Sequence, residues 1–301
     1  MKIGMVGLGR MGMNMARRLL QGGHQVVAYN RSPAKTEELA KDGAEASFSL
    51  AELVGKLDER KVVWLMLPAG QTVEDHIDQL IELLAPGDII IEGGNSYFKD
   101  DIRRAEKLAS HDLHYVDAGV SGGIWGLKVG YCTMVGGRRD DFAYLEPIFK
   151  TLAPPEGYMY CGPTGAGHFV KMVHNGIEYG MMQAYGEGFA LIEASEYKQV
   201  DFGDLSRLWN QGSVIRSWLL ELLERAFADD PELAELQGYV DDSGEGRWTV
   251  LQAVESGVSA PVITSALFRR FESRQADAFE NRVLAALRQQ FGGHAVQKKD
   301  R

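Results

Sequence analysis

The sequence predicts two domains, a doubly wound α/β domain with a mostly parallel sheet and, after it, a domain made only of helices. In the first half of the chain, short apolar runs alternate with amphipathic stretches, a pattern typical of right-handed βαβ units. Beyond about residue 165 the strand patterns stop and only helical periodicity continues. We therefore expect one domain over residues 1–165 and the other over residues 166–301.

The expected strands are rich in Val and Ile and almost continuously apolar, as strands buried on both faces are. They cover Lys2–Gly7, Gln25–Tyr29, Val62–Leu67, Ile89–Glu92, His114–Val116, Tyr131–Gly136 and Tyr158–Cys161. Helices are expected between them over Met11–Leu20, Glu74–Leu84, Ile102–Ala109 and Phe142–Leu152. The second domain should open with a long helix from Gly167 to about Glu196, followed by helical stretches over Leu205–Asn210, Ile215–Ala226, Thr249–Ser256 and Ser265–Arg288.

Composition excludes several classes of partner. The formal net charge of −10 leaves no overall basic surface for nucleic acid. No apolar run is long enough to suggest a membrane span, and a strand pattern that starts at Met1 leaves no room for a signal peptide. Cys132 and Cys161 lie in apolar stretches and are expected to be small buried side chains. We therefore expect a cytoplasmic protein with a small-molecule ligand.

A glycine-rich fingerprint follows the first expected strand. Residues 7–12, Gly-Leu-Gly-Arg-Met-Gly, match G-x-G-x-x-G where a helix begins. Gly7 allows a tight turn, Gly9 lets the backbone approach a pyrophosphate, and Gly12 lets the helix pack closely on the strand. The helix N-terminus offers unpaired N–H groups and a partial positive charge to the phosphates. These features predict a Rossmann dinucleotide-binding domain.

The residues after the second strand bear on the choice of dinucleotide. An NAD site usually places an acidic residue about 20 positions beyond the fingerprint. This chain has Asn30-Arg31-Ser32 there, and Arg31 can pair with a 2′-phosphate. We expect NADP, with NAD as the alternative; an exposed Arg31 without this role also stays open. The expected cofactor contacts are Gly7, Leu8, Gly9, Arg10, Met11, Gly12, Asn30, Arg31, Ser32, Leu67 and Asn95.

Polar groups gather on one side of the expected long helix. At ~100° per residue, His174, Asn175 and Glu178 fall within about 60° of Lys171. The flanking residues are apolar and predict a helix that is buried around most of its circumference: Phe169, Met172, Val173, Ile177, Met181 and Met182. Because buried charge is costly unless it is used or paired, we favour a functional stripe over an exposed Lys–Glu stripe.

Two glycine-containing segments follow expected strands. They are Glu92-Gly-Gly-Asn95-Ser96 and Asp117-Ala-Gly-Val-Ser121-Gly122-Gly123. Ligands of open α/β sheets bind at the carboxyl ends of the strands, where glycines let backbone N–H groups face the ligand. Each segment is either such a ligand loop or only a turn.

Together these segments resemble the 6-phosphogluconate dehydrogenase family. The resemblance rests on residues 7–12, 93–96 and 119–123 and on Lys171–Tyr179. The string His-Asn-Gly-Ile-Glu-Tyr at 174–179 is the most specific, because more distant β-hydroxyacid dehydrogenases share the glycine blocks and the Lys without it. Arg288 and His294 are similar to an Arg and a His in the family's tail.

The resemblance implies oxidative decarboxylation of 6-phosphogluconate to ribulose 5-phosphate and CO₂, the pentose-phosphate reaction, with reduction of NAD(P)⁺. In it, Lys171 is the general base and then polarises the ketone, and Glu178 protonates carbon 1 of the product. The implied substrate contacts are Asn95, Ser121, Gly122, Gly123, His174, Asn175, Tyr179, Arg270, Arg288 and His294. Arg288 and His294 would come from a partner subunit, in a homodimer or homotetramer with shared active sites. No metal is expected.

One loop departs from the family pattern. Longer members have Lys-Gly-Thr-Gly-Lys-Trp-Thr where this chain has Ser243-Gly-Glu245-Gly-Arg247-Trp-Thr. Ser243 and Glu245 replace the first Lys and the Thr, which weakens the loop's expected hold on phosphate. Arg247 matches the second Lys.

Two other functions compete. A β-hydroxyacid dehydrogenase for a small non-phosphorylated acid shares Lys171 and the glycine blocks. It has no use for the combination of Glu178, Arg270, Arg288 and His294. A dinucleotide-sensing protein without turnover needs neither Lys171 nor Glu178.

Overall fold

The computed structural model describes residues 1–292, 295 and 297. Its strands are β1 (Lys2–Val6), β2 (Gln25–Tyr29), β3 (Glu45–Ser47), β4 (Val62–Leu65), β5 (Ile89–Glu92), β6 (His114–Ser121), β7 (Cys132–Gly137) and β8 (Tyr158–Gly162). Helices of the first half are α1 (Arg10–Gln21), α2 (Pro33–Ala40), α3 (Leu50–Gly55), α4 (Gln71–Ile81), α5 (Phe98–Ala109), the short η1 (Gly123–Trp125), α6 (Gly126–Val129) and α7 (Arg139–Leu152). Those of the second half are α8 (Ala166–Glu193), α9 (Phe202–Trp209), α10 (Trp218–Asp229), α11 (Glu245–Glu255), α12 (Pro261–Glu272) and α13 (Phe279–Gly292).

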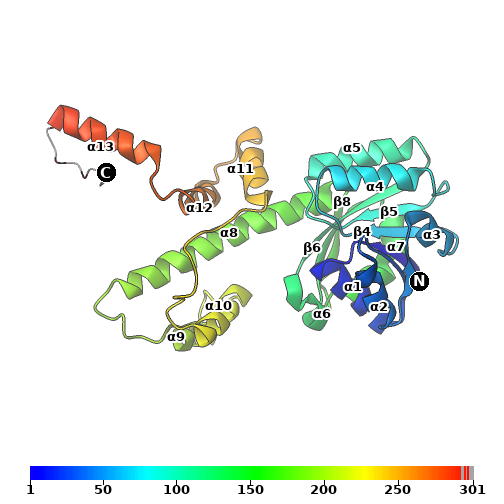
Figure 1. Ribbon diagram of the computed structural model, residues 1–301, viewed down its shortest axis with the longest axis horizontal. Coiled ribbons are helices and arrows are strands. Elements are labelled where there is room, and N and C mark those ends of the chain that lie inside the picture. The colour runs from blue at the N-terminus through cyan, green and yellow to red at the C-terminus, as the bar shows by residue number, and fades with distance from the viewer. Residues whose placement is uncertain (293–294, 296, 298–301) are drawn as a thin grey trace. The chain divides into compact units, whose positions relative to one another are not determined.

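The strands form one sheet in the order β3-β2-β1-β4-β5-β6-β7-β8. The pairs from β3 to β6 are parallel, β6 and β7 are antiparallel, and β7 and β8 are parallel again. The carboxyl ends of β1, β4 and β5 therefore meet at one edge of the sheet. The predicted fold class, a mostly parallel Rossmann-type sheet followed by helices, is confirmed (Figure 1).

The sheet is covered on both faces because its central strands are apolar at most positions. Ile89 and Ile91 of β5 belong to one core, with side chains of α1, α2 and α7, whereas Ile90 belongs to the other, with side chains of α3, α4 and α5. Successive strand side chains point to opposite faces, so a continuous apolar run supplies both cores. This is the physical reason that the run predicts a central parallel strand.

Several expected boundaries differ from the structure. β6 continues to Ser121, whereas the sequence analysis ended this strand at Val116, because residues 117–121 pair with β7. The expected helical stretch Ser265–Arg288 is two helices, α12 and α13, and the segment 273–278 between them has no large apolar side chain. The strand β3 and the helices α2 and α3 were not expected; a three-residue strand is too short to show periodicity.

The expectation for the two cysteines was wrong. Cys132 is exposed and Cys161 is half-buried. They lie on β7 and β8, the last two strands at one end of the sheet. Their apolar sequence neighbours did not reveal this position.

Two units make up the chain, Met1–His174 and Asn175–Arg301, and α8 runs from the first into the second. The expected domain boundary at residue 165 stays a prediction. In the second unit, Phe189 of α8 packs with Leu220 and Phe227 of α10. Among the helices that the structure describes, none is long and apolar enough to cross a membrane.

From Ile177 onward, α8 is less buried than its apolar sequence predicts. Ile177 is 53% exposed and Met182 is 43% exposed, so the expectation of a helix buried around most of its circumference was wrong for this part. The part of the helix before Ile177 follows the expectation better, because Met172 is buried there.

Candidate active site

The glycine fingerprint forms a tight loop between β1 and α1. Gly7 has φ +94°, and a Cβ there would lie 2.4 Å from the Met66 carbonyl oxygen. A Cβ on Gly12 would lie 2.1 Å from the Gly7 oxygen, so the helix packs against the loop backbone. A Cβ on Gly9 would meet nothing within 4 Å. The open side of the loop at Gly9 thus gives the room that a pyrophosphate needs.

The first turn of α1 has free donors for such a group. Gly9 precedes the helix, and no side chain of the described residues caps it. The first N–H groups of a helix have no partner within the helix and attract anions. The residues present therefore fit a dinucleotide, with Arg10 and Met11 in that first turn.

Asn30 and Arg31 follow β2 beside this loop. The Leu8 N–H donates to the Asn30 side-chain oxygen at 2.9 Å, and the Asn30 amide donates to the Ser32 carbonyl at 3.2 Å. Asn30 thereby braces the glycine loop. Arg31 is exposed and has no ion pair within the part of the chain that the structure describes. Its guanidinium is available to a 2′-phosphate.

Lys171 and Asn95 meet at the carboxyl edge of the sheet. Asn95 follows β5 and Lys171 lies in the second turn of α8, and the Lys171 ammonium donates to the Asn95 side-chain oxygen. Lys171 is only 9% exposed. Leu67 follows β4 at the same edge, and a Cβ on Gly94 would lie 2.6 Å from its carbonyl oxygen. The structure thus joins two segments that sequence analysis selected separately.

Ser121 and His174 also come together in the first unit. Ser121 ends β6, and its hydroxyl lies 3.5 Å from His174 Nε2. The next two residues, Gly122 and Gly123, have φ of +140° and +53°, and this turn leads into η1. The sequence analysis placed Ser121 in a loop or turn. In the structure it is instead the last residue of β6.

Asn175 and Glu245 form a pair in the second unit. The Asn175 amide donates to Glu245 Oε1 at 2.9 Å, and the Ser243 hydroxyl donates to Glu245 Oε2 at 2.6 Å. Glu245 is 1% exposed. Ser243 and Glu245, which replace the family's Lys and Thr, therefore bond to each other. Glu245 in turn orients Asn175.

Arg270 lies over the ring of Tyr179, with its guanidinium carbon 3.4 Å from the ring centroid. Two of the implied substrate contacts are thus adjacent in the second unit. Arg247 is held differently, because it forms two hydrogen bonds with Asp242, at 2.6 and 3.0 Å. Together with Arg274, Arg247 lowers the pKa of Asp242 to about 2. The positive charge of Arg247 is thus already balanced by the Asp242 carboxylate.

The other expected site residues are more dispersed. Glu178 is half-buried on α8, close in sequence to Asn175. Arg288 is exposed on α13 and has no hydrogen bond or ion pair within the described residues. His294 lies outside the residues that the structure describes. The roles of all these residues stay predictions.

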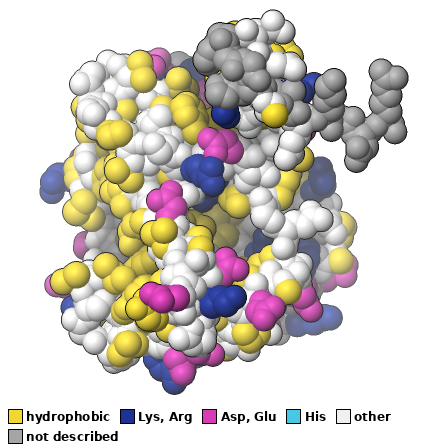
Figure 2. Space-filling model, turned by 90° about the vertical axis from the view of Figure 1, so that its left-hand side faces the viewer, with side chains coloured by type: hydrophobic (Ala, Val, Ile, Leu, Met, Phe, Trp, Pro, Cys, Tyr) yellow, Lys and Arg dark blue, Asp and Glu magenta, His cyan; other side chains and the backbone are white. Residues whose placement is uncertain are grey.

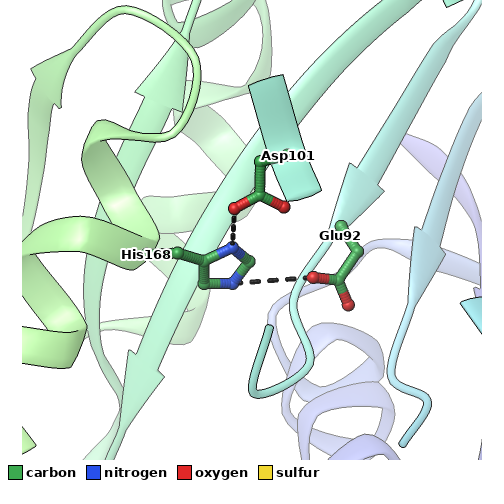
Figure 3. A group of neighbouring side chains, drawn as sticks. All are labelled: Glu92, Asp101 and His168. Atoms are coloured by element: carbon green, nitrogen blue, oxygen red, sulfur yellow. Dashed lines mark hydrogen bonds and ion pairs between the residues drawn. The ribbon is translucent and has the colours of Figure 1, made fainter. Parts of the chain in front are cut away.

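Sequence analysis missed a group of buried charges that supports this edge of the sheet. Asp117 of β6 accepts the N–H groups of Gly165 and His168 at 2.7 and 2.9 Å, at the start of α8. His168 also contacts Asp101 and Glu92 (Figure 3). Burial raises the pKa of Asp117, and the nearby His168 charge opposes this shift. In the sequence, the signal that could have revealed this group was His168, one helical turn before Lys171.

Family comparison accounts for both units. Residues 2–162 match the NAD-binding domain of 6-phosphogluconate dehydrogenase, and residues 167–301 match its C-terminal domain. The chain belongs to the 6-phosphogluconate dehydrogenase family. The resemblance expected from the sequence is thereby confirmed.

Individual members of the family align along the whole chain. YqeC of Bacillus subtilis, named as a 6-phosphogluconate dehydrogenase, is 46% identical over 99% of this chain and 100% of its own length. The NAD⁺-dependent, decarboxylating 6-phosphogluconate dehydrogenase of Haloferax volcanii is 43% identical over 100% of both chains. Plasmodium falciparum 6-phosphogluconate dehydrogenase, solved with NADP⁺ and with 6-phosphogluconate, superposes with TM-score 0.84 at 29% identity, over 99% of this chain and 66% of that one.

We expect Gly9→Ala to weaken dinucleotide binding without unfolding the protein. Gly9 has φ −67°, which Ala adopts freely, and its Cβ position is empty, so only the approach of the pyrophosphate is obstructed. Affinity for reduced cofactor, measured by its fluorescence, should fall at least about tenfold, ~1.4 kcal/mol. Gly55→Ala is the control, because its Cβ position is also empty. Unchanged affinity in Gly9→Ala would place the pyrophosphate elsewhere.

Proposed function

We propose that this chain catalyses the NAD(P)-dependent oxidative decarboxylation of 6-phosphogluconate to ribulose 5-phosphate and CO₂. The observation that carries the proposal is the buried Lys171 ammonium on Asn95 at the carboxyl edge of the sheet. The glycine loop after β1 opens at the same edge. Dinucleotide and substrate sites of doubly wound sheets occupy this edge. The proposed location is the cytoplasm, and a small sugar-acid phosphate is the proposed partner.

Lys171 and Glu178 divide the proton transfers in this proposal. Lys171, as the neutral amine, takes the proton of the 3-hydroxyl group; a dinucleotide held by the glycine loop would supply the hydride acceptor for carbon 3. The protonated Lys171 then donates a hydrogen bond to the 3-keto oxygen, which stabilises the enediol left when the carboxylate departs as CO₂. Glu178 protonates carbon 1 of the product. Asn95 holds the Lys171 side-chain nitrogen near the substrate.

The direct test is an assay of reduced cofactor at 340 nm with purified protein. We expect turnover with 6-phosphogluconate and little with 3-hydroxyisobutyrate, a small unphosphorylated acid. Preference for the small acid would support the β-hydroxyacid dehydrogenase alternative. Cofactor binding without turnover of either acid would support the sensing protein.

Variants of Lys171 and Glu178 should affect different steps. Lys171→Ala should lower the rate of cofactor reduction on the order of 10²–10⁴-fold, as loss of a general base does. Glu178→Gln should slow release of ribulose 5-phosphate more than cofactor reduction, because its proton is needed after oxidation. Stopped-flow absorbance at 340 nm and product analysis separate the two. Near-normal reduction in a Lys171→Ala protein that binds cofactor would remove Lys171 from this role.

Arg31 is proposed to favour NADP by pairing with its 2′-phosphate. Arg31→Ala should raise the KM for NADP by about 10- to 150-fold, equivalent to ~1.5–3 kcal/mol for one charge-assisted contact, and should barely change the KM for NAD. Arg138→Ala is the control, since Arg138 is also an exposed arginine of the first unit. Wild-type preference for NAD, together with an unchanged variant, would make Arg31 an ordinary surface residue.

We also propose that the active protein is a homodimer or homotetramer in which Arg288 and His294 complete a partner's site. Large apolar side chains of the second unit are exposed in the single chain, for example Val254 at 76% and Phe279 at 70%. Figure 2 shows hydrophobic side chains, interspersed with charged ones, on the face turned to the viewer. A two-fold interface would bury such a surface. Since Arg247 is paired with Asp242, a phosphate dianion needs further cations.

Complementation tests the shared sites. Lys171→Ala and Arg288→Ala proteins, each weakly active alone, should recover part of the activity when their subunits exchange, because one mixed site has both residues intact. A mixture of Lys171→Ala and Glu178→Gln is the control. Both of these residues lie on α8 of one chain, so their mixture should recover nothing. Absence of recovery in the first mixture, with mixed oligomers demonstrated by differently tagged subunits, would show that each chain uses its own Arg288.

A further inference from the structure

A cluster of charged side chains is fully buried in the first unit, and its members are close in the sequence to Asn95 or to Lys171. Glu92 ends β5, Asp101 and Arg104 lie on α5, and His168 lies in the first turn of α8; each is at most 1% exposed. Figure 3 shows the His168 ring between the two carboxylates. All four residues belong to the first unit. The proposed reaction steps use none of them.

His168 lies between two buried carboxyl groups. Its Nδ1 lies 2.7 Å from Asp101 Oδ2, and its Nε2 lies 3.7 Å from Glu92 Oε2. Burial lowers the pKa of His168, but the Asp101 and Glu92 carboxylates, with Asp117 beyond them, outweigh burial and raise it to about 9. Asp101 Oδ1 also accepts a hydrogen bond from the Tyr115 hydroxyl at 2.8 Å.

The cluster does not suit a metal ion, although its three potential ligand atoms lie within 4.8 Å of one another. Arg104 Nη1 lies 3.6 Å from Asp101 Oδ1 and 4.0 Å from Glu92 Oε2. A guanidinium is always charged, so the two carboxylates already face two cations. A divalent ion in the same space would be repelled. The cluster is therefore an internal ion network.

This network connects the two segments that present Lys171 and Asn95. Glu92 Oε1 accepts the Gly94 N–H at 2.8 Å, which shapes the turn that precedes Asn95. On α8, His168 precedes Lys171 by three residues, about one helical turn. The ion pair between Glu92 and His168 and the hydrogen bond between Asn95 and Lys171 thus link the same two segments twice. The result is a closed ring of contacts.

The backbone of α8 has little freedom to adjust if one of these links is lost. A Cβ on Gly119 of β6 would lie 2.4 Å from Lys171 Cβ, and one on Gly167 would lie 2.5 Å from the Met134 carbonyl oxygen. The helix thus packs on the sheet with its backbone. A small shift of the helical turn at His168 should therefore displace Lys171, because the helix backbone between the two residues cannot adjust to compensate.

We propose that His168 is a positioning residue for Lys171: through Asp101 and Glu92 it fixes the first turn of α8 against the Gly93–Gly94 turn, so that Lys171 and Asn95 stay in register. The catalytic part of this inference rests on the proposed function. Its structural part concerns the free protein and does not require that function.

The chain offers a matched control for a histidine variant. His114 Nδ1 lies 2.7 Å from Asp141 Oδ1, and Asp141 also bonds to Arg60 at 2.5 Å. This second pair of a histidine and a buried carboxylate lies at the start of β6, away from the carboxyl edge. His168→Gln and His114→Gln therefore remove similar contacts, and only the first touches the Lys171 turn.

Two measurements compare the variants. The first is kcat and KM for 6-phosphogluconate at saturating cofactor. The second is the rate of reductive methylation of Lys171 in the free protein, mapped by mass spectrometry relative to the exposed Lys150. His168→Gln should lower kcat on the order of 10²-fold, as small misplacements of reacting groups do, with a much smaller change in KM. It should also increase methylation of Lys171. His114→Gln should change neither.

The outcomes separate this inference from the proposed function. Wild-type kcat and wild-type protection of Lys171 in His168→Gln would overturn it, as would equal losses in His114→Gln. If His168→Gln does not fold, Glu92→Gln replaces it, because the amide oxygen still accepts from Gly94 while the attraction to His168 is lost; unchanged Lys171 methylation there would also overturn the inference. A wild-type protein without turnover of 6-phosphogluconate would defeat the proposed function, and the methylation comparison would still decide the positioning role.

Discussion

The attachment of α8 to the sheet sets the geometry of everything around Lys171. Asp117, in the middle of β6, accepts two backbone N–H groups at the start of α8, from Gly165 and His168. A carboxylate is a strong acceptor for the unpaired donors of a helix N-terminus, and its charge is favourable there. Because Gly119 and Gly167 leave no room for side chains, the helix then crosses the sheet with its backbone in contact. Lys171 is thereby placed at the carboxyl edge of the sheet, where the Asn95 side-chain oxygen accepts a hydrogen bond from Lys171 Nζ.

The same edge contains an unusual amount of buried charge. Glu92, Asp101 and Arg104 are 0% exposed, and His168 is 1% exposed. Such groups cost free energy when they leave water, and breaking one buried pair typically costs about 3–5 kcal/mol. An apolar cluster of the same volume would hold the segments together at least as firmly. Charge pairs differ in that they favour one relative placement, which an active-site scaffold requires.

In the second unit, the charged side chains of the loop around Glu245 are paired with one another or with polar groups. Glu245 brings a buried carboxylate into the loop that departs from the pattern expected of longer family members. Both of its oxygens are occupied, by Asn175 and by Ser243. Arg247 is likewise occupied by Asp242, whereas Arg270 rests on the Tyr179 ring with its charge less compensated. The loop's departures from the family are thus mutually consistent: Glu245 holds the amide of Asn175, a proposed substrate contact. In our proposal, the phosphate is bound by Arg270 and by a partner's tail.

The sequence by itself determined the elements whose signals are local. The apolar runs of β1, β2, β4 and β5, the glycine loop and the polar stripe on α8 all follow from short-range periodicity and turn chemistry, and each was predictable. It did not reveal that β6 continues to Ser121, because the ladder with β7 that extends it is formed by residues more than ten positions away. Nor did it reveal Asp117, Asp101 and His168 as one network, since their contacts join β6, α5 and α8. Only tertiary structure decided these features, because the free energy of a buried charge depends on which partner the fold places beside it, and that partner is distant in the sequence.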